Sequence, residues 1–301
     1  MLIVFSLAIH ILNLPFEITM IIFEHYLPQY PRRPLAVDLA LFGWICGQWR
    51  AVAFAAPRLW RAFTMNLNAM MISHQAKALQ EWLRRSGTLP ISIDILLPAD
   101  QPCCLQEMNN IVSLILAHSC RWEHIGLMLP FESLRLLQGR MPVLRSLIIG
   151  PTEVPMPPPA SPISLFGESP CLDTVRLSRC FEPDYVTLPW TNLTWIEADF
   201  LYPEECVTIL TETVNVVHFS AAVESSKEVL RRVPILSKLR SLILSPGDAV
   251  PREMRLLDAL TLPSLETLQI CGLWFSPNPW LTVFSLVTRS RCELREVRIV
   301  L

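Results

Sequence analysis

The stretch LRSLIL, residues 239–244, carries the pattern that decides the fold, because its apolar side chains stand at positions i, i+3 and i+5. The last two of these positions, Leu242 and Leu244, are two residues apart and therefore lie on the same side of a β-strand. We interpret the stretch as one short strand with a buried face.

The same template recurs along the chain after residue 63, at intervals of 21 to 29 residues. Such a period is typical of a solenoid with one short strand in each repeat. We therefore predict an α/β fold over residues 63–301, a curved solenoid whose strands run parallel. The eight matches are Trp122/Ile125/Leu127, Leu144/Leu147/Ile149, Leu172/Val175/Leu177, Leu193/Ile196/Ala198, Val214/Val217/Phe219, Leu239/Leu242/Leu244, Leu265/Leu268/Ile270 and Leu294/Val297/Ile299.

Helices or turns are expected between these strands. A capping box at 225–228 and prolines at Pro251 and Pro279 mark three helix starts. The proline-rich segment 151–163 is an insertion that we expect to form a stiff loop. No polar capping repeat precedes Leu301, so we expect the natural chain to continue beyond it.

The N-terminal part, residues 12–62, has a helical pattern. A helix over 14–27, opened by Pro15, places Ile18, Ile21 and Ile22 on one stripe and a second apolar set on another, namely Phe16, Met20, Phe23 and Leu27. A surface helix normally buries one such stripe, so the second requires another surface to cover it. A further helix is predicted from about 35 to 55, ended by Pro57.

Composition limits the class of protein. Of the 301 residues, 51% are hydrophobic and 17% charged, which is typical of a chain with a packed core. A formal net charge of −2 gives no electrostatic reason to expect binding to nucleic acid or an anionic membrane. The nine cysteines contain no CxxC motif and predict reduced thiols in the cytosol or nucleus.

The first residues, MLIVFSLAIHIL, are apolar but lack the basic start and the cleavage site of a signal peptide. The uncharged run ends at Glu17, short of the roughly 20 residues that a membrane span needs. Residues 1–11 are interpreted as apolar packing before the first helix or as additions from a mis-assigned start; a signal or anchor is the remaining alternative.

The sequence contains no motif that supports an enzyme: no G-x-S-x-G, P-loop, H-E-x-x-H or glycine-rich dinucleotide turn. The nearest approach to a metal-binding set is His118, Cys120 and His124, to which Cys103 or Cys104 would add a ligand. The spacing is not that of a zinc site. We therefore predict a non-enzymatic protein without cofactor or metal.

The segments LPFEITMIIFEHYL (14–27), CGQWR (46–50) and PRLW (57–60) together resemble the F-box, in the variant abundant in mushroom-forming fungi. In that family the F-box precedes degenerate leucine-rich repeats. The resemblance implies an F-box-like helical domain over 12–62 and a leucine-rich-repeat-like solenoid over 63–301. Gly43 and Gly47 depart from the family pattern and weaken the second helix, since glycine costs about 1 kcal/mol against alanine.

The resemblance also implies a function: substrate recognition in a Skp-cullin-F-box ubiquitin ligase, in the cytosol or nucleus. The F-box helices would dock on a Skp-type adaptor and the repeats would bind a protein target. The residues that match the adaptor-facing positions are Leu14, Pro15, Ile18, Ile22, Phe23, Cys46 and Trp49.

Target contacts are expected from strand residues that point away from the core, because repeat surfaces of this kind usually bind partners. The polar or aromatic candidates are Arg176, Trp195, Glu197, His218, Gln269 and Arg298. One alternative is a repeat-based interaction scaffold outside the ubiquitin system. Another is an extracellular or membrane-anchored repeat receptor, suggested by the apolar start and the NLT sequon at Asn192.

Overall fold

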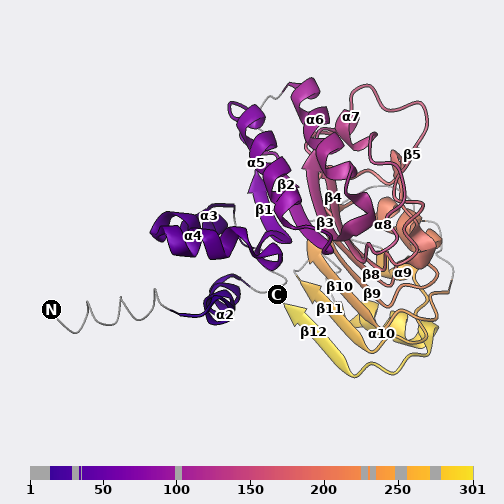
Figure 1. Cartoon of the computed structure of the whole chain (residues 1–301). Helices are drawn as coiled ribbons and strands as arrows, with labels where there is room; N and C mark the ends of the chain where they lie inside the picture. The colour runs from indigo at the N-terminus through magenta and orange to yellow at the C-terminus, as the bar shows by residue number, and fades with distance from the viewer. Residues whose placement is uncertain are drawn as a thin grey trace. The chain divides into compact units, whose positions relative to one another are not determined.

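The computed structural model describes residues 14–28, 34, 36–98, 104–224, 230, 235–247, 256–271 and 279–300. These residues form a mixed α/β structure with nine α-helices, α2 to α10, and an open ten-stranded sheet (Figure 1). The first apolar residues, the capping box at 225–228, Pro251 and Leu301 lie outside the described part. The chain divides into two compact units, Met1–Leu127 and Met128–Leu301.

The first unit begins with helices and continues with alternating strands and helices. Its elements in chain order are α2 (Phe16–Tyr26), α3 (Ala36–Ile45), α4 (Gly47–Phe54), the 3-10 turn η1 (Pro57–Trp60), β1 (Ala62–Asn66), α5 (Ile72–Arg85), β2 (Ile91–Leu96), α6 (Leu105–Leu116), η2 (Ser119–Arg121) and most of β3 (Trp122–Leu129).

The second unit contains most of the sheet. Its elements are α7 (Phe131–Leu134), β4 (Ser146–Pro151), β5 (Ile163–Ser164), β6 (Thr174–Leu177), β7 (Val186–Thr187), η3 (Trp190–Asn192), β8 (Trp195–Leu201), α8 (Pro203–Glu212), β9 (His218–Val223), β10 (Ser241–Pro246), α9 (Leu256–Ala259), β11 (Thr267–Cys271), α10 (Pro279–Ser290) and β12 (Glu296–Val300). The insertion 151–163 begins at the last residue of β4 and ends at the first of β5, which pairs with β7 in a small separate sheet.

The large sheet is parallel, as the template predicts. Its strand order is β1-β2-β3-β4-β6-β8-β9-β10-β11-β12, so its strands follow chain order, with β5 and β7 left out. The template positions pair across it: Val175 lies beside Ile196, which lies beside Phe219, which lies beside Leu242. All four side chains are fully buried, so this ladder forms the core of the second unit.

The register predicted for β9 is wrong by two residues. Val214 and Val217 are 56% and 36% exposed, whereas Val216 and Ala221 are buried. Pairing of Ile196 with Phe219 makes Phe219 the second template residue of its repeat, and Val216 the first. Valines at 214, 216 and 217 allow the template to start at either Val214 or Val216, and only the strand pairing in the sheet distinguishes these two registers.

Two strands, β1 and β2, are absent from the eight predicted repeats. Trp60, Phe63 and Met65 fit the template and are buried. Their arrangement is the same as that of Trp122, Ile125 and Leu127 in β3. In β2 the equivalent first position, 30 residues later, is Pro90. The parallel stack therefore starts at residue 62, and the predicted first strand at 122 is its third.

The helix predicted over 35–55 is two helices, α3 and α4, which are separated at Cys46. The backbone of Cys46 is extended, with φ −159° and ψ 167°, and its Sγ accepts a hydrogen bond from the Trp49 backbone N–H at 3.4 Å. Gly43 and Gly47 on either side lower the helical preference of this segment. The thiol therefore caps the N-terminus of α4.

None of the helices in the described ranges is both long enough and apolar enough to cross a membrane.

Candidate functional site

An aromatic cluster joins the helices of the N-terminal segment. The Phe23 ring stacks on Phe42 with 4.1 Å between ring centroids and meets Trp49 edge-on at 5.0 Å. Phe23 has no exposed surface. It therefore belongs to the core of the helical segment, and its predicted place among adaptor-facing residues does not fit this structure.

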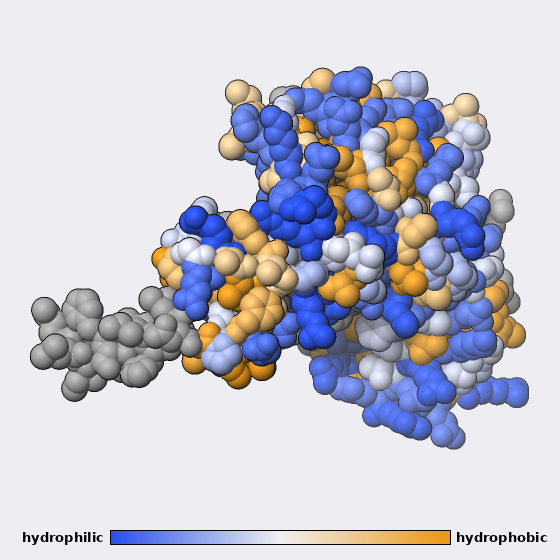
Figure 2. Space-filling view, in the orientation of Figure 1, coloured by the Kyte–Doolittle hydropathy of each residue, from blue (hydrophilic) through white to orange (hydrophobic). Residues whose placement is uncertain are grey.

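The other apolar stripe of α2 remains uncovered. Ile18, Ile21 and Ile22 are 44%, 49% and 41% exposed, whereas Phe23 and Leu27 are buried. Hydrophobic atoms gather on the surface formed by α2 to α4 (Figure 2). Three large aliphatic side chains side by side on one helix form a patch of the kind that marks an interaction site.

The remaining residues predicted to face an adaptor differ in exposure. Pro15 is exposed, whereas Leu14, Cys46 and Trp49 are half-buried. Periodicity did not identify three further apolar side chains that the structure exposes nearby in sequence. These are Tyr26, Trp44 and Phe54, of which Trp44 is the most exposed at 67%. Ile45, which the three- and four-residue spacing places on one apolar helix face, is 56% exposed. Trp44 and Ile45 lie at the end of α3, directly before the break that the prediction of a single helix overlooked.

The six predicted target-facing residues all lie on the outer face of the sheet in the second unit. Strand pairing places Trp195 beside His218 in one row, and Arg176 beside Glu197 in the next. Further along this second row, Gln269 lies beside Arg298. The alternation of side chains along each strand thus brings the predicted residues into two adjacent rows.

Trp195 is the centre of the contacts on this face. Its ring stacks on the imidazole of His218 at 3.7 Å and 15°, and its Nε1 donates a hydrogen bond to Glu197 Oε1 at 2.9 Å. Burial lowers the pKa of His218, with the Glu197 carboxylate acting in the opposite direction. The tryptophan is nevertheless 43% exposed, so one face of a fixed aromatic ring is open to a partner.

Arg176 lies in the row next to Trp195 and is held by an acid. Its Nη2 and Nε donate to Asp199 Oδ1 at 2.8 and 3.1 Å. Tryptophan and arginine are the residues most enriched among those that dominate binding energy at interfaces. The two side chains therefore form the strongest candidate for a protein-binding centre on the sheet.

The predicted absence of a metal site rests on sequence spacing. His118 Nδ1 lies 3.3 Å from Arg121 Nη2, Cys120 is exposed and His124 lies in β3. Within the described ranges, no three His, Cys, Asp or Glu side chains are grouped as metal ligands would be. The sequon asparagine, Asn192, is exposed at the end of η3, and the following Leu193 is buried as predicted.

Comparison of the sequence with protein-family models and with curated proteins finds no match.

Proposed function

We propose that this protein is a non-enzymatic adaptor that recruits a protein target to a Skp-cullin-F-box ubiquitin ligase in the cytosol or nucleus. The exposed stripe Ile18, Ile21 and Ile22 is the observation that carries the proposal. The opposite stripe of the same helix already supplies the core through Phe23 and Leu27. The three isoleucines are thus free to bury their surface against an adaptor, at about 25 cal/mol for each Å² removed from water.

The proposed adaptor surface consists of Leu14, Pro15, Ile18, Ile21, Ile22, Cys46 and Trp49. It differs from the surface that the F-box resemblance implies in omitting Phe23 and adding Ile21. The proposed target surface is the outer sheet face around Arg176, Trp195 and Glu197, with Gln269 and Arg298 further along it. His218 is only 7% exposed and supports the Trp195 ring that stacks on it. The two surfaces lie in different compact units of the chain.

A pull-down of purified Skp-type adaptor by the full chain tests the docking step. We expect Ile18→Asp/Ile22→Asp to weaken adaptor binding at least roughly tenfold, because each change puts a charge into the apolar patch. The matched control is Leu281→Asp/Phe284→Asp on α10, where both side chains are also exposed, at 65% and 71%. It should bind like the native chain, and circular dichroism should show that both variants are folded.

Absence of binding by the native chain would exclude the ligase role. The repeat-based scaffold outside the ubiquitin system would then be the better account, since it needs only the outer sheet face. Equal binding by the Ile18→Asp/Ile22→Asp variant would leave an adaptor role but remove α2 from its interface.

A further inference from the structure

A cleft of about 330 Å³ lies within the first unit, between side chains of α3, α4, η1 and α5. Its walls include Trp44, Arg50, Phe54, Glu81, Trp82 and Arg85. The proposed docking of α2 does not use it. With Trp60, four aromatic side chains and three charged groups surround one space, a combination that suits a ligand with both an apolar and a charged group.

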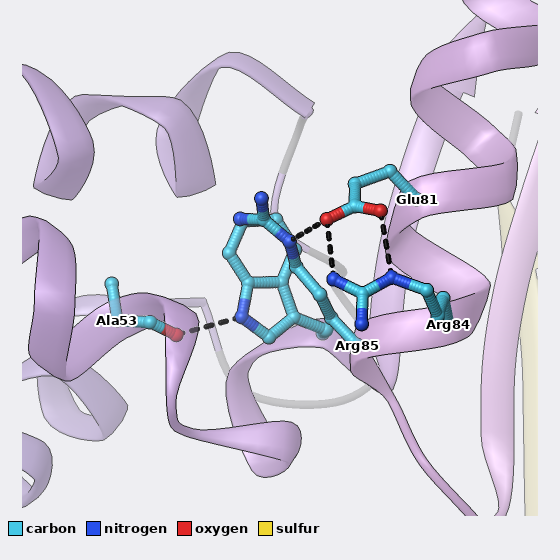
Figure 3. Close-up of polar contacts among 5 residues, drawn as sticks. Ala53, Glu81, Arg84 and Arg85 are labelled. Carbon is cyan, nitrogen blue, oxygen red and sulfur yellow. Dashed lines mark hydrogen bonds and ion pairs between the residues drawn. The ribbon is translucent and has the colours of Figure 1, made fainter.

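The one carboxylate in this wall already accepts three hydrogen bonds from arginines. Glu81 accepts from Nε and Nη2 of Arg84 at 2.8 and 2.7 Å, and from Nε of Arg85 at 2.8 Å (Figure 3). These hydrogen bonds lower the pKa of Glu81 to about 2. Glu81 therefore stays ionised and is already shared between two cations, so the cleft has little to offer a positively charged ligand.

Positive charge is in excess around the cleft. The Arg85 guanidinium lies over the Phe54 ring at 3.6 Å from its centroid and 4.7 Å from that of Trp60, which itself donates to the Ala53 carbonyl at 2.7 Å. Packing against two rings fixes this cation in the wall.

Arg50 is held through its Nε alone, which donates to the Gly43 carbonyl oxygen at 2.6 Å. Across the described ranges, the terminal Nη atoms of Arg50 and Arg85 make no hydrogen bond to protein. A guanidinium with free Nη groups suits a carboxylate, with which it forms two parallel hydrogen bonds.

The aromatic walls are open as well. Trp44 is 67% exposed and Phe54 is 43% exposed, although both border the cleft. Large exposed rings beside a cation favour a ligand that has an aromatic group next to an anion, because the ring buries apolar area while the anion pairs with arginine.

We propose that this cleft binds an acidic peptide segment of a partner protein, in which an aromatic side chain stands beside Asp or Glu. The aromatic side chain packs on Trp44 and Trp82, and the carboxylate pairs with Arg50 and Arg85. This binding goes beyond the proposed adaptor role and does not depend on it, because the isoleucines of α2 contribute nothing to the cleft.

The test follows the indole N–H signals of Trp44 and Trp82 by NMR while peptide is added to the full chain. The acidic probe has the sequence Gly-Glu-Phe-Glu-Gly with blocked ends, and the neutral probe replaces both glutamates by glutamine. We expect the acidic probe to shift both signals to saturation and the neutral probe to bind roughly tenfold more weakly, since charge-assisted hydrogen bonds are lost. Added salt should weaken only the acidic probe.

Substitutions in the protein distinguish binding of the probe in the cleft from nonspecific electrostatic attraction. Arg50→Gln keeps a donor for the Gly43 carbonyl and should lower affinity for the acidic probe roughly tenfold. The control Arg58→Gln removes a cation that is 75% exposed, is 3.9 Å from Glu24 and does not line the cleft; it should change nothing. Equal affinity of the two probes, or no effect of Arg50→Gln, would overturn the proposal.

Adaptor binding by Arg50→Gln distinguishes this proposal from the previous one. The variant should bind the Skp-type adaptor like the native chain while losing the acidic probe. A native chain that binds the probe but no adaptor would retain the cleft and reject the ligase role.

Discussion

Glu205, in the first turn of α8, is a carboxyl whose ionisation opposes folding. Burial raises its pKa to about 8, and a hydrogen bond with the Glu182 side chain acts in the same direction. Its Oε2 also accepts from the Tyr202 backbone N–H at 2.6 Å, which caps the helix. The ordinary pKa of this carboxyl is 4.5. Between pH 4.5 and about 8, Glu205 is therefore protonated in the folded chain and ionised in the unfolded chain.

The free energy of unfolding should therefore fall as pH rises from 4.5 towards 8, and level off above that range. We expect Glu205→Gln to flatten this slope and to stabilise the protein at pH 8 by about 1 kcal/mol, after allowance for partial exposure. The amide oxygen can still accept from Tyr202. Urea unfolding at several pH values measures the effect, and an unchanged slope would mean that Glu205 does not titrate in this range.

Gly150 in β4 packs so closely against Ser178 that one added carbon atom does not fit. A Cβ at this position would lie 1.5 Å from Ser178 Oγ and 2.7 Å from Ser178 Cβ, so the backbone or the serine must move. We expect Gly150→Ala to lower the free energy of unfolding by about 1–3 kcal/mol. Gly167→Ala, where no atom lies within 4 Å of the added carbon, is the control and should be nearly neutral. Equal effects of the two changes would contradict the packing.

The strand β9 and the residues directly before it show how a correct pattern can be placed in the wrong register. Val216 is 1% exposed and Val214 is 56% exposed. Val216→Asp should destabilise the protein by about 3 kcal/mol or more, because it buries a charge without a partner. Val214→Asp should change stability by less than about 0.5 kcal/mol. Thermal unfolding of both variants checks this, and the reverse order would restore the register predicted from sequence.

Most strands of the sheet could be predicted because each buries apolar residues at the same three template positions. Seven of the eight template matches have the predicted register, since apolar residues two apart leave few other ways to bury a strand. The strand β2 was not predictable in this way, because Pro90 interrupts its template. The strand β1 was not predicted because Trp60, the first position of its template, also belongs to the PRLW motif that ends the helical segment.

The helical segment was less predictable because apolar residues cover both sides of α2. Periodicity identifies two stripes but cannot tell which one faces inward. Phe42 stacks on Phe23 and so buries this part of the second stripe, whereas Phe16 at the start of the same stripe is 44% exposed. Similarly, the cleft depends on contacts between α4 and α5, such as Arg85 over Phe54, that no local sequence pattern reveals.

A stack of parallel strands such as the large sheet should open from its edge. Within the large sheet, each strand of the second unit pairs with the strands before and after it in the sheet order, so an internal strand is held on two sides and β12 on one. Nearest-neighbour stacking of this kind allows local opening at an end before the middle. Two buried thiols allow the middle and the edge of the stack to be compared. Cys206 lies in α8, between the inner strands β8 and β9, and Cys292 lies shortly before the edge strand β12.

Alkylation of the native protein, followed residue by residue with mass spectrometry, measures this order. Burial raises the pKa of both thiols, most strongly that of Cys206, so both should react slowly while the structure is closed. We expect the exposed Cys104, Cys120 and Cys171 to react first, then Cys292, and Cys206 last. Equal rates for Cys292 and Cys206 would show that the second unit opens as one cooperative block, since a block that opens all at once exposes its edge and its centre together.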